Sequence, residues 1–210
     1  MINDLEVDLR PKLGLVRDQG ARRTCLSHAL TASHEYVRGS HVRLSAEYLH
    51  YFATGGLPSQ GASIAGARLA LERDGQPEER FCPDLLKSPP GRWKPDDGCI
   101  LFRRKSISLL HSCREVERAI RETRIPVLGI RLPHAFFRPE DPWVIPPGNR
   151  TYGLHAVVGA GLGLHEEDLV VLIRNSWGAD WGENGHALLS ENFLDRHLVD
   201  VMLLTEELTG

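Results

Sequence analysis

The sequence QGARRTCLSHAL, residues 19–30, is the most informative stretch of the chain. It reads as a turn that leads into a helix, with Cys25 at the junction. Apolar residues then recur near a 3.6-residue period, and Gly39 marks the predicted end of the helix. A thiol at a helix N-terminus lies in the partial positive charge of unpaired backbone N–H groups, which stabilises the nucleophilic thiolate. By itself Cys25 has a simpler interpretation as a small core residue, but two later segments favour a reactive thiol.

Two segments in the second half supply partners for such a thiol. The run GLHAVVG, residues 153–159, places His155 at the start of an apolar stretch that predicts a buried strand. The run RNSWGADWGENG, residues 174–185, places Asn175 before a tryptophan and a glycine-rich turn. A cysteine nucleophile needs a base, and the base needs a group that fixes its ring orientation and tautomer. Cys25, His155 and Asn175 supply these three roles in that order, so the pattern predicts nucleophilic catalysis.

These segments resemble the papain-like (C1) cysteine peptidases, a family in which a cysteine works with distant histidine and asparagine partners. The run NSWGADWGENG, residues 175–185, carries most of the resemblance. The Gln-Gly before Cys25 and the His-Ala that opens a strand are two further signatures. The resemblance extends from Val7 to Leu204, which is nearly the whole chain.

The resemblance implies roles for individual residues. By match to the family motifs, Cys25 is the nucleophile, His155 the general acid and base, and Asn175 the group that orients the ring. Gln19 is implied to be the side-chain donor of the oxyanion hole, and Trp177 to cover the bond between His155 and Asn175. The residues expected along the substrate cleft are Gly61, Arg23, Thr24, Ala156 and Trp177.

The sequence beside the nucleophile departs from the family pattern CGSCW, because residues 22–26 read RRTCL. Leu26 replaces a large aromatic residue, and Arg23 replaces a glycine that lines the cleft in the family. Gly61 follows Gln60 where the family has two glycines, and is expected to let substrate backbone approach closely. We therefore advance the hypothesis that Arg22 or Arg23 narrows the cleft and favours acidic substrate side chains; the alternative is that both point to solvent.

The resemblance implies an α+β fold of two lobes with the active-site cleft between them. We expect one papain-like domain over residues 1–210, with a helical lobe over roughly 19–110. An antiparallel, barrel-like β lobe is expected over roughly 111–210, together with the N-terminal segment. Serines that begin helices are predicted before the apolar runs at Ser45, Ser63 and Ser112. Strands are predicted over residues 100–102, 126–132, 155–158, 169–173, 186–189 and 198–204, and a proline-rich surface loop over 82–98.

Composition narrows the partners that we expect. Of the 210 residues, 41% are hydrophobic and 25% charged, and the formal net charge is −3, which gives no electrostatic reason to expect a nucleic-acid partner. No apolar run is long enough for a membrane span, so no membrane association is expected. The histidines and cysteines are not spaced closely in the way that metal ligands usually are, so we expect no metal site. We expect no cofactor either.

The start of the chain and its cysteines bear on compartment and control. The N-terminus resembles neither a secretory signal nor the inhibitory propeptide of the family. The three thiols of Cys82, Cys99 and Cys113 cannot all form disulfides with one another, so the chain has no disulfide framework of the kind found in secreted proteins. We therefore expect a cytoplasmic enzyme, or one that is exported by a non-classical route. Its control would then come from a separate protein inhibitor or regulator, from narrow specificity, or from a partner, and a monomer is expected.

The sequence thus predicts a cysteine endopeptidase that acts on polypeptides. One alternative keeps the same thiol site but uses it for another acyl transfer, namely deamidation, transpeptidation or isopeptide cleavage. A second alternative is a non-catalytic binding module on a papain-like scaffold. The joint presence of Gln19, Cys25, His155 and Asn175 argues against the binding module, because a scaffold does not need all four.

Overall fold

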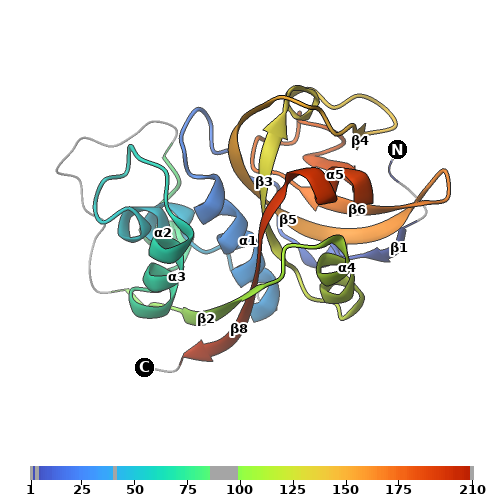
Figure 1. The fold of residues 1–210 in the computed structure, drawn as a ribbon. Coiled ribbons are helices and arrows are strands. Elements are labelled where there is room, and N and C mark those ends of the chain that lie inside the picture. Colours follow the sequence, from blue (N-terminus) through green and yellow to red (C-terminus); the bar gives the residue numbers. More distant parts are fainter. Residues whose placement is uncertain (1, 3–4, 40–41, 86–98, 209–210) are drawn as a thin grey trace.

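The computed structural model of the protein describes residues 2, 5–39, 42–85 and 99–208. Three helices gather on one side of the molecule, and most of an eight-stranded sheet forms the other side (Figure 1). The helices are α1 (Cys25–Arg38), α2 (Ala46–Ala53) and α3 (Ile64–Arg73). This arrangement is the α+β, two-lobe, papain-like fold that the sequence predicts.

The ends of the helices follow from single residues. The Ser45 and Ser63 side chains each accept a backbone N–H from the first turn, at 2.9 Å from Tyr48 and 3.0 Å from Gly66. Helix α1 ends at Gly39, whose φ of 62° lies in the left-handed region that glycine adopts without a steric penalty. The predicted starts at Ser45 and Ser63 and the predicted stop at Gly39 are therefore confirmed.

The sheet has the strand order β2-β8-β3-β5-β6-β7-β4, and β1 pairs with β5 outside this path. All of its pairs are antiparallel except the pair of β4 with β7. The long strand β5 lies at the centre and carries His155. The strands are β1 (Leu5–Asp8), β2 (Arg103–Leu109), β3 (Val127–Pro133), β4 (Val144–Ile145), β5 (Thr151–His165), β6 (Asp168–Arg174), β7 (His186–Ser190) and β8 (Leu198–Leu208).

Two further helices, α4 (Cys113–Arg121) and α5 (Glu191–His197), lie on the side of the strands. Ser112 begins α4 as predicted, and its hydroxyl accepts the Glu115 N–H at 3.3 Å. Short 3-10 turns occupy Arg10–Lys12, Glu79–Phe81 and His134–Phe137.

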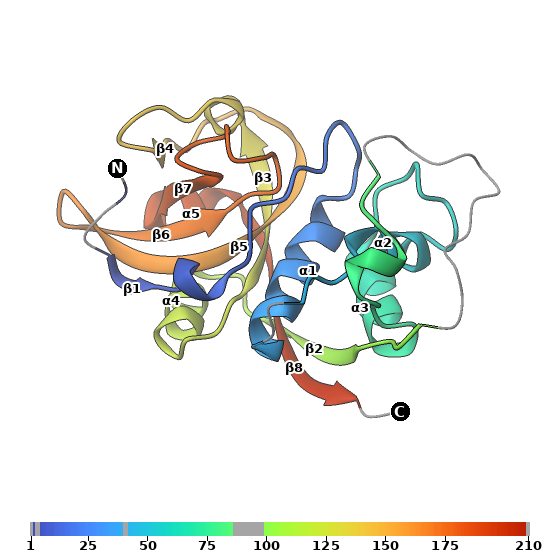
Figure 2. The ribbon, with the colours of Figure 1, turned by 180° about the vertical axis from the view of Figure 1, so that it is seen from behind.

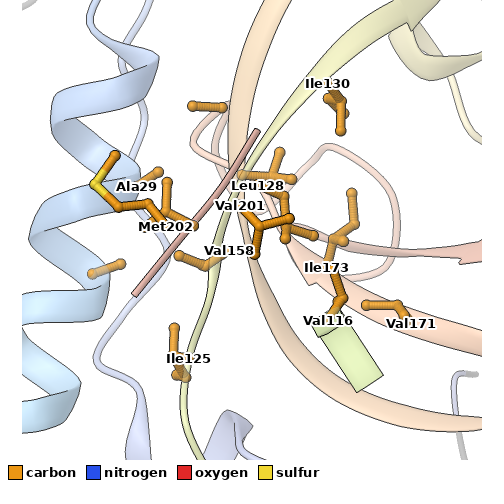
Figure 3. Packing of buried hydrophobic residues seen from close by; sticks show 14 of the residues in the cluster. Ala29, Val116, Ile125, Leu128, Ile130, Val158, Val171, Ile173, Val201 and Met202 are labelled. Atoms are coloured by element: carbon orange, nitrogen blue, oxygen red, sulfur yellow. The ribbon is translucent and has the colours of Figure 1, made fainter. Parts of the chain in front are cut away.

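One continuous hydrophobic core joins the two lobes. Figure 3 shows Ala29 of α1 beside Met202 of β8, with Val158 of β5 nearby. Seen from behind, the segment that follows β1 runs across the molecule to α1 (Figure 2). Gln19 lies on this segment, six residues before α1 begins at Cys25. Because the lobes share a core, side chains that face each other across their junction are held in a fixed geometry.

Some elements differ from the predictions. The strand predicted over 100–102 begins later, as β2, and pairs with β8, so the sheet reaches beneath α3. Most of the loop predicted over 82–98 lies outside the described residues. Within the described parts of the chain, no helix is long and apolar enough to cross a lipid bilayer.

Candidate active site

Cys25 is the first residue of α1, and its side chain is only partly exposed. Thr24, directly before it, accepts the backbone N–H of His28 at 3.0 Å and so closes the first turn of the helix. The sulfur interacts with the backbone of Ala156, the residue after His155 on β5. The thiol from the helical lobe therefore meets the strand that carries the predicted base.

His155 and Asn175 are bonded side chain to side chain. Nε2 of His155 lies 2.7 Å from Oδ1 of Asn175, and both residues are buried. The same Oδ1 accepts the Ser176 backbone N–H at 2.8 Å. Because a backbone N–H can only donate, this contact identifies the atom facing His155 as the amide oxygen. The proton of the neutral imidazole must then sit on Nε2, which leaves Nδ1 as the basic nitrogen.

Aromatic rings enclose the His155 imidazole. The Trp177 ring centroid lies 4.7 Å from that of His155, and the Phe136 centroid lies 5.6 Å away, edge to face. Trp177 and Phe136 also pack against each other, with centroids 5.5 Å apart. These rings limit rotation of the imidazole and keep water from its bond to Asn175.

The Gln19 loop is tied to the Asn175 loop. The Gln19 backbone N–H donates to the Ser176 carbonyl at 2.8 Å, and Asp18 forms an antiparallel bridge with Trp177. The Gln19 amide also bonds at both ends: Oε1 accepts from the Ser176 hydroxyl at 2.7 Å, and Nε2 donates to the Arg22 carbonyl at 2.6 Å. The predicted oxyanion donor is thus fixed in place beside the Asn175 loop.

A cleft of about 680 Å³ runs between the lobes at this point. Four of its lining residues are Gln19, Cys25, His155 and Trp177, which the sequence predicts to act together. Gly61, Arg23 and Ala156, predicted along the substrate path, line it as well. Thr24 does not: it is buried, and its place at the start of α1 turns its side chain inward, which corrects that prediction.

Arg22 and Arg23, which we expected to shape the cleft, lie in different surroundings. The Arg22 guanidinium is buried and pairs with the Glu47 carboxylate, so it is not free to select substrates. Arg23 is exposed, and within the described residues its guanidinium forms no ion pair or hydrogen bond. Of these two arginines, it is therefore Arg23 that offers the cleft a positive charge with no paired carboxylate among the described residues.

Burial is the largest influence on the pKa values of both Cys25 and His155. It lowers the pKa of His155 to about 4, although the hydrogen bond to Asn175 acts in the opposite direction. It raises the pKa of the Cys25 thiol, although backbone hydrogen bonds from Ala156, Leu26 and Cys25 itself lower it in part. Position at a helix N-terminus predicts a lowered pKa for this thiol. Desolvation of the sulfur acts in the opposite direction and is the largest influence on its pKa.

Several lining residues escaped the sequence analysis. Gly129 of β3 and Asp200 of β8 stand opposite each other in the strand register, and both line the cleft. An added Cβ at Gly129 would lie 3.2 Å from the Asp200 Cβ, so the glycine leaves space beside the carboxylate. Tyr152 and Leu154 line the opening on either side of Gly153. No motif marks these positions, because strands distant in the sequence bring them together.

No group of three or more possible metal ligands comes together in the described ranges.

The chain is similar to known cysteine proteases. The family model described as "Papain family cysteine protease" matches residues 145–199, which include His155 and Asn175. The thiol protease aleurain of Arabidopsis thaliana is 25% identical over 186 residues, which cover 81% of this chain. The chain spans about half the length of this curated relative, because the match covers 51% of aleurain.

Solved structures share the fold at lower identity. Xylellain, a cysteine protease from Xylella fastidiosa, superposes with a TM-score of 0.82 at 22% identity, over 95% of this chain and 85% of that one. The Carica candamarcensis cysteine protease CMS1MS2, in complex with E-64, gives a TM-score of 0.74 at 20% identity, over 95% and 97% of the two chains. The match of residues 145–199 to the family model, the similarity to aleurain and the common fold together show that the chain resembles the papain-family cysteine proteases.

Proposed function

We propose that the protein is a cysteine endopeptidase that hydrolyses peptide bonds in the cleft between its lobes. The observation that carries the proposal is the arrangement of three groups across the cleft. The Cys25 sulfur reaches the backbone next to His155, and Asn175 holds the far nitrogen of the ring. This is the geometry that nucleophile, base and orienting group need.

The first step joins the thiol to the substrate. Nδ1 of His155 takes the proton of Cys25 as the thiolate attacks the carbonyl carbon, and a C–S bond forms. The low pKa of His155 and the raised pKa of Cys25 oppose separated charges, so the proton passes within the site as substrate binds. The substrate carbonyl oxygen becomes an oxyanion.

The oxyanion is stabilised by two donors, the Cys25 backbone N–H and a Gln19 Nε2–H. Gln19 has two amide hydrogens and donates to the Arg22 carbonyl, so one hydrogen is left for the cleft that Gln19 lines. A donor of this kind contributes on the order of 3 kcal/mol to lowering the barrier.

Release follows in two further steps. The imidazolium gives its proton to the leaving nitrogen, the C–N bond breaks, and a thioester remains on Cys25. Water then attacks the thioester while Nδ1 takes one of its protons. The acid product leaves, and the proton returns to the sulfur.

The test combines covalent labelling with product analysis. A thiol-directed epoxide should label the wild-type protein at Cys25 and leave Cys82, Cys99 and Cys113 unmodified. Labelling should be lost in Cys25→Ala and strongly slowed in His155→Ala. Mass spectrometry of a peptide mixture should show new termini from hydrolysis; deamidated or ligated products would instead favour another acyl transfer. An unlabelled wild-type protein that yields no product would overturn the proposal in favour of a binding module.

A further inference from the structure

A buried ion pair anchors the loop before the nucleophile. Arg22, three residues before Cys25, donates through both terminal nitrogens to the Glu47 carboxylate of α2, with Nη2 2.9 Å from Oε1. Arg22 is 7% exposed and Glu47 is 1% exposed. Removing two charges from water is costly, and such a pair is often no better for stability than a hydrophobic contact. The pair therefore needs an explanation beyond stability.

The same guanidinium reaches two other segments. Nη1 donates to the Leu85 carbonyl at 3.0 Å, and Nη2 donates to the Pro58 carbonyl at 3.3 Å. The Leu85 backbone N–H in turn donates to Glu47 at 3.4 Å. One side chain thus fixes the irregular segment between Gly20 and Thr24 to α2 and to two loops of the helical lobe.

The backbone of Arg22 holds Gln19. Its carbonyl accepts Gln19 Nε2 at 2.6 Å, and its N–H donates to the Gln19 carbonyl at 3.4 Å. A carbonyl only accepts, so this contact determines which end of the Gln19 amide is nitrogen. Any shift of the Arg22 backbone would rotate or displace the amide that faces the cleft.

We infer that the Arg22–Glu47 ion pair positions the Gln19 amide for oxyanion stabilisation, and Arg22 and Glu47 are thus positioning residues. The inference rests on the proposed function of Gln19. It also explains why a buried charge stands three residues before Cys25. The two terminal nitrogens of the guanidinium donate in several directions at once and so hold the Arg22 segment, which an apolar side chain cannot do. Misplacement of a catalytic group by about 1 Å can cost on the order of 100-fold in rate.

The test is a double-mutant cycle on peptide hydrolysis. Glu47→Gln should lower kcat about 10-fold while KM changes less than about 2-fold, because the lost contact acts in the transition state. In a Gln19→Ala background the same substitution should change kcat less than about 2-fold, because the group that it positions is absent. Equal losses in both backgrounds, or an unchanged kcat, would overturn the inference.

Controls separate positioning from general damage. Glu207→Gln removes a carboxylate from the buried Arg104, 3.2 Å away at the far end of β2 and β8, and should leave kcat unchanged. Arg22→Lys keeps the charge but loses the fork, and should give an intermediate kcat. If Glu47→Gln does not fold, the cycle is run with Arg22→Lys and is read in the same way.

A second measurement does not depend on catalysis. The Gln19 side-chain amide should give resolved, slowly exchanging NMR signals in the wild-type protein and in Glu207→Gln. In Glu47→Gln these signals should broaden and exchange faster. If the Gln19 signals are unchanged in Glu47→Gln, the positioning role is refuted, whether or not the protein hydrolyses peptides. If the signals behave as expected but the wild-type protein hydrolyses no peptide, only the proposed function is refuted.

Discussion

Oδ1 of Asn175 accepts two hydrogen bonds, from His155 Nε2 at 2.7 Å and from the Ser176 backbone N–H at 2.8 Å. The backbone bond determines the orientation of the amide, and the amide determines the tautomer of the imidazole. The basic nitrogen is thereby placed on the side away from Asn175. The residue after His155 contacts the Cys25 sulfur, so in the proposed mechanism the orientation of the ring determines whether Nδ1 can take the thiol proton.

Replacing Asn175 by alanine should free the ring. We expect kcat to fall by 10- to 100-fold with a small change in KM, because the imidazole then populates both tautomers and other orientations. Steady-state kinetics on a peptide that the wild-type protein cleaves would measure this. Asn175→Asp keeps an acceptor for both donors and should retain more activity than the alanine variant; equal activity of the two variants would contradict the orienting role.

A second buried histidine should make the fold sensitive to acid. His34 of α1 is fully buried, and its Nδ1–H donates to Gln76 Oε1 at 2.8 Å. Burial lowers its pKa from 6.5 to about 4, and the nearby Arg104 and Arg38 lower it further, whereas the bond to Gln76 raises it. Between pH 6.5 and 4 the unfolded chain therefore binds a proton that the folded protein does not. The contribution of His34 to the free energy of unfolding is therefore fully present above pH 6.5 and declines as the pH falls towards 4.

Between pH 6.5 and pH 4, the free energy of unfolding should fall by on the order of 3 kcal/mol because of His34 alone. Urea unfolding at pH 7 and pH 4.5 would measure it. His34→Asn keeps a donor for Gln76 but does not titrate, so the difference between the two pH values should shrink. His111→Asn changes an exposed histidine and serves as the control. If His34→Asn leaves the difference as large as in the wild-type protein, His34 is not its source.

Substrate preference should depend on Arg23. Its exposed guanidinium lines the cleft, so a peptide library should show enrichment of Asp or Glu at the substrate position nearest to it. Exposed ion pairs contribute about 0.2 to 1 kcal/mol, which corresponds to no more than about a 5-fold gain in kcat/KM. Arg23→Gln should abolish the enrichment and leave cleavage of neutral peptides unchanged. A library profile indifferent to charge would mean that Arg23 points only to solvent.

The sequence predicts local features well where one residue controls them. Ser45, Ser63 and Ser112 each accept a first-turn N–H, and Gly39 ends α1 in the left-handed region. These features depend on neighbours along the chain, which a single sequence displays. The motif around Asn175 is similarly local, so the relation of His155 to Asn175 could be anticipated.

Features that depend on long-range packing could not be predicted. The sequence leaves Arg22 either in the cleft or in solvent, and only the fold brings Glu47 of α2 against it. Asp200 and Gly129 face one cleft because β8 pairs with β3, which no local pattern indicates. The raised pKa of Cys25 was not predicted either, because it comes from burial of the sulfur in the folded protein, which the sequence around Cys25 does not display.

Gly66 offers a test of how closely α2 and α3 pack. It lies in α3, where alanine would normally favour the helix by up to about 1 kcal/mol. An added Cβ, however, would overlap the Ala53 carbonyl oxygen at the end of α2, and this backbone atom cannot move without α2. Gly66→Ala should therefore destabilise the protein by about 1 to 3 kcal/mol, as overpacking does.

Gly14→Ala is the matched control, because an added Cβ at Gly14 would meet no atom within 4 Å. This substitution should change the free energy of unfolding by less than about 0.5 kcal/mol. Urea denaturation of both variants would decide the matter: a Gly66→Ala protein as stable as the wild type would show that the two helices can separate at no cost.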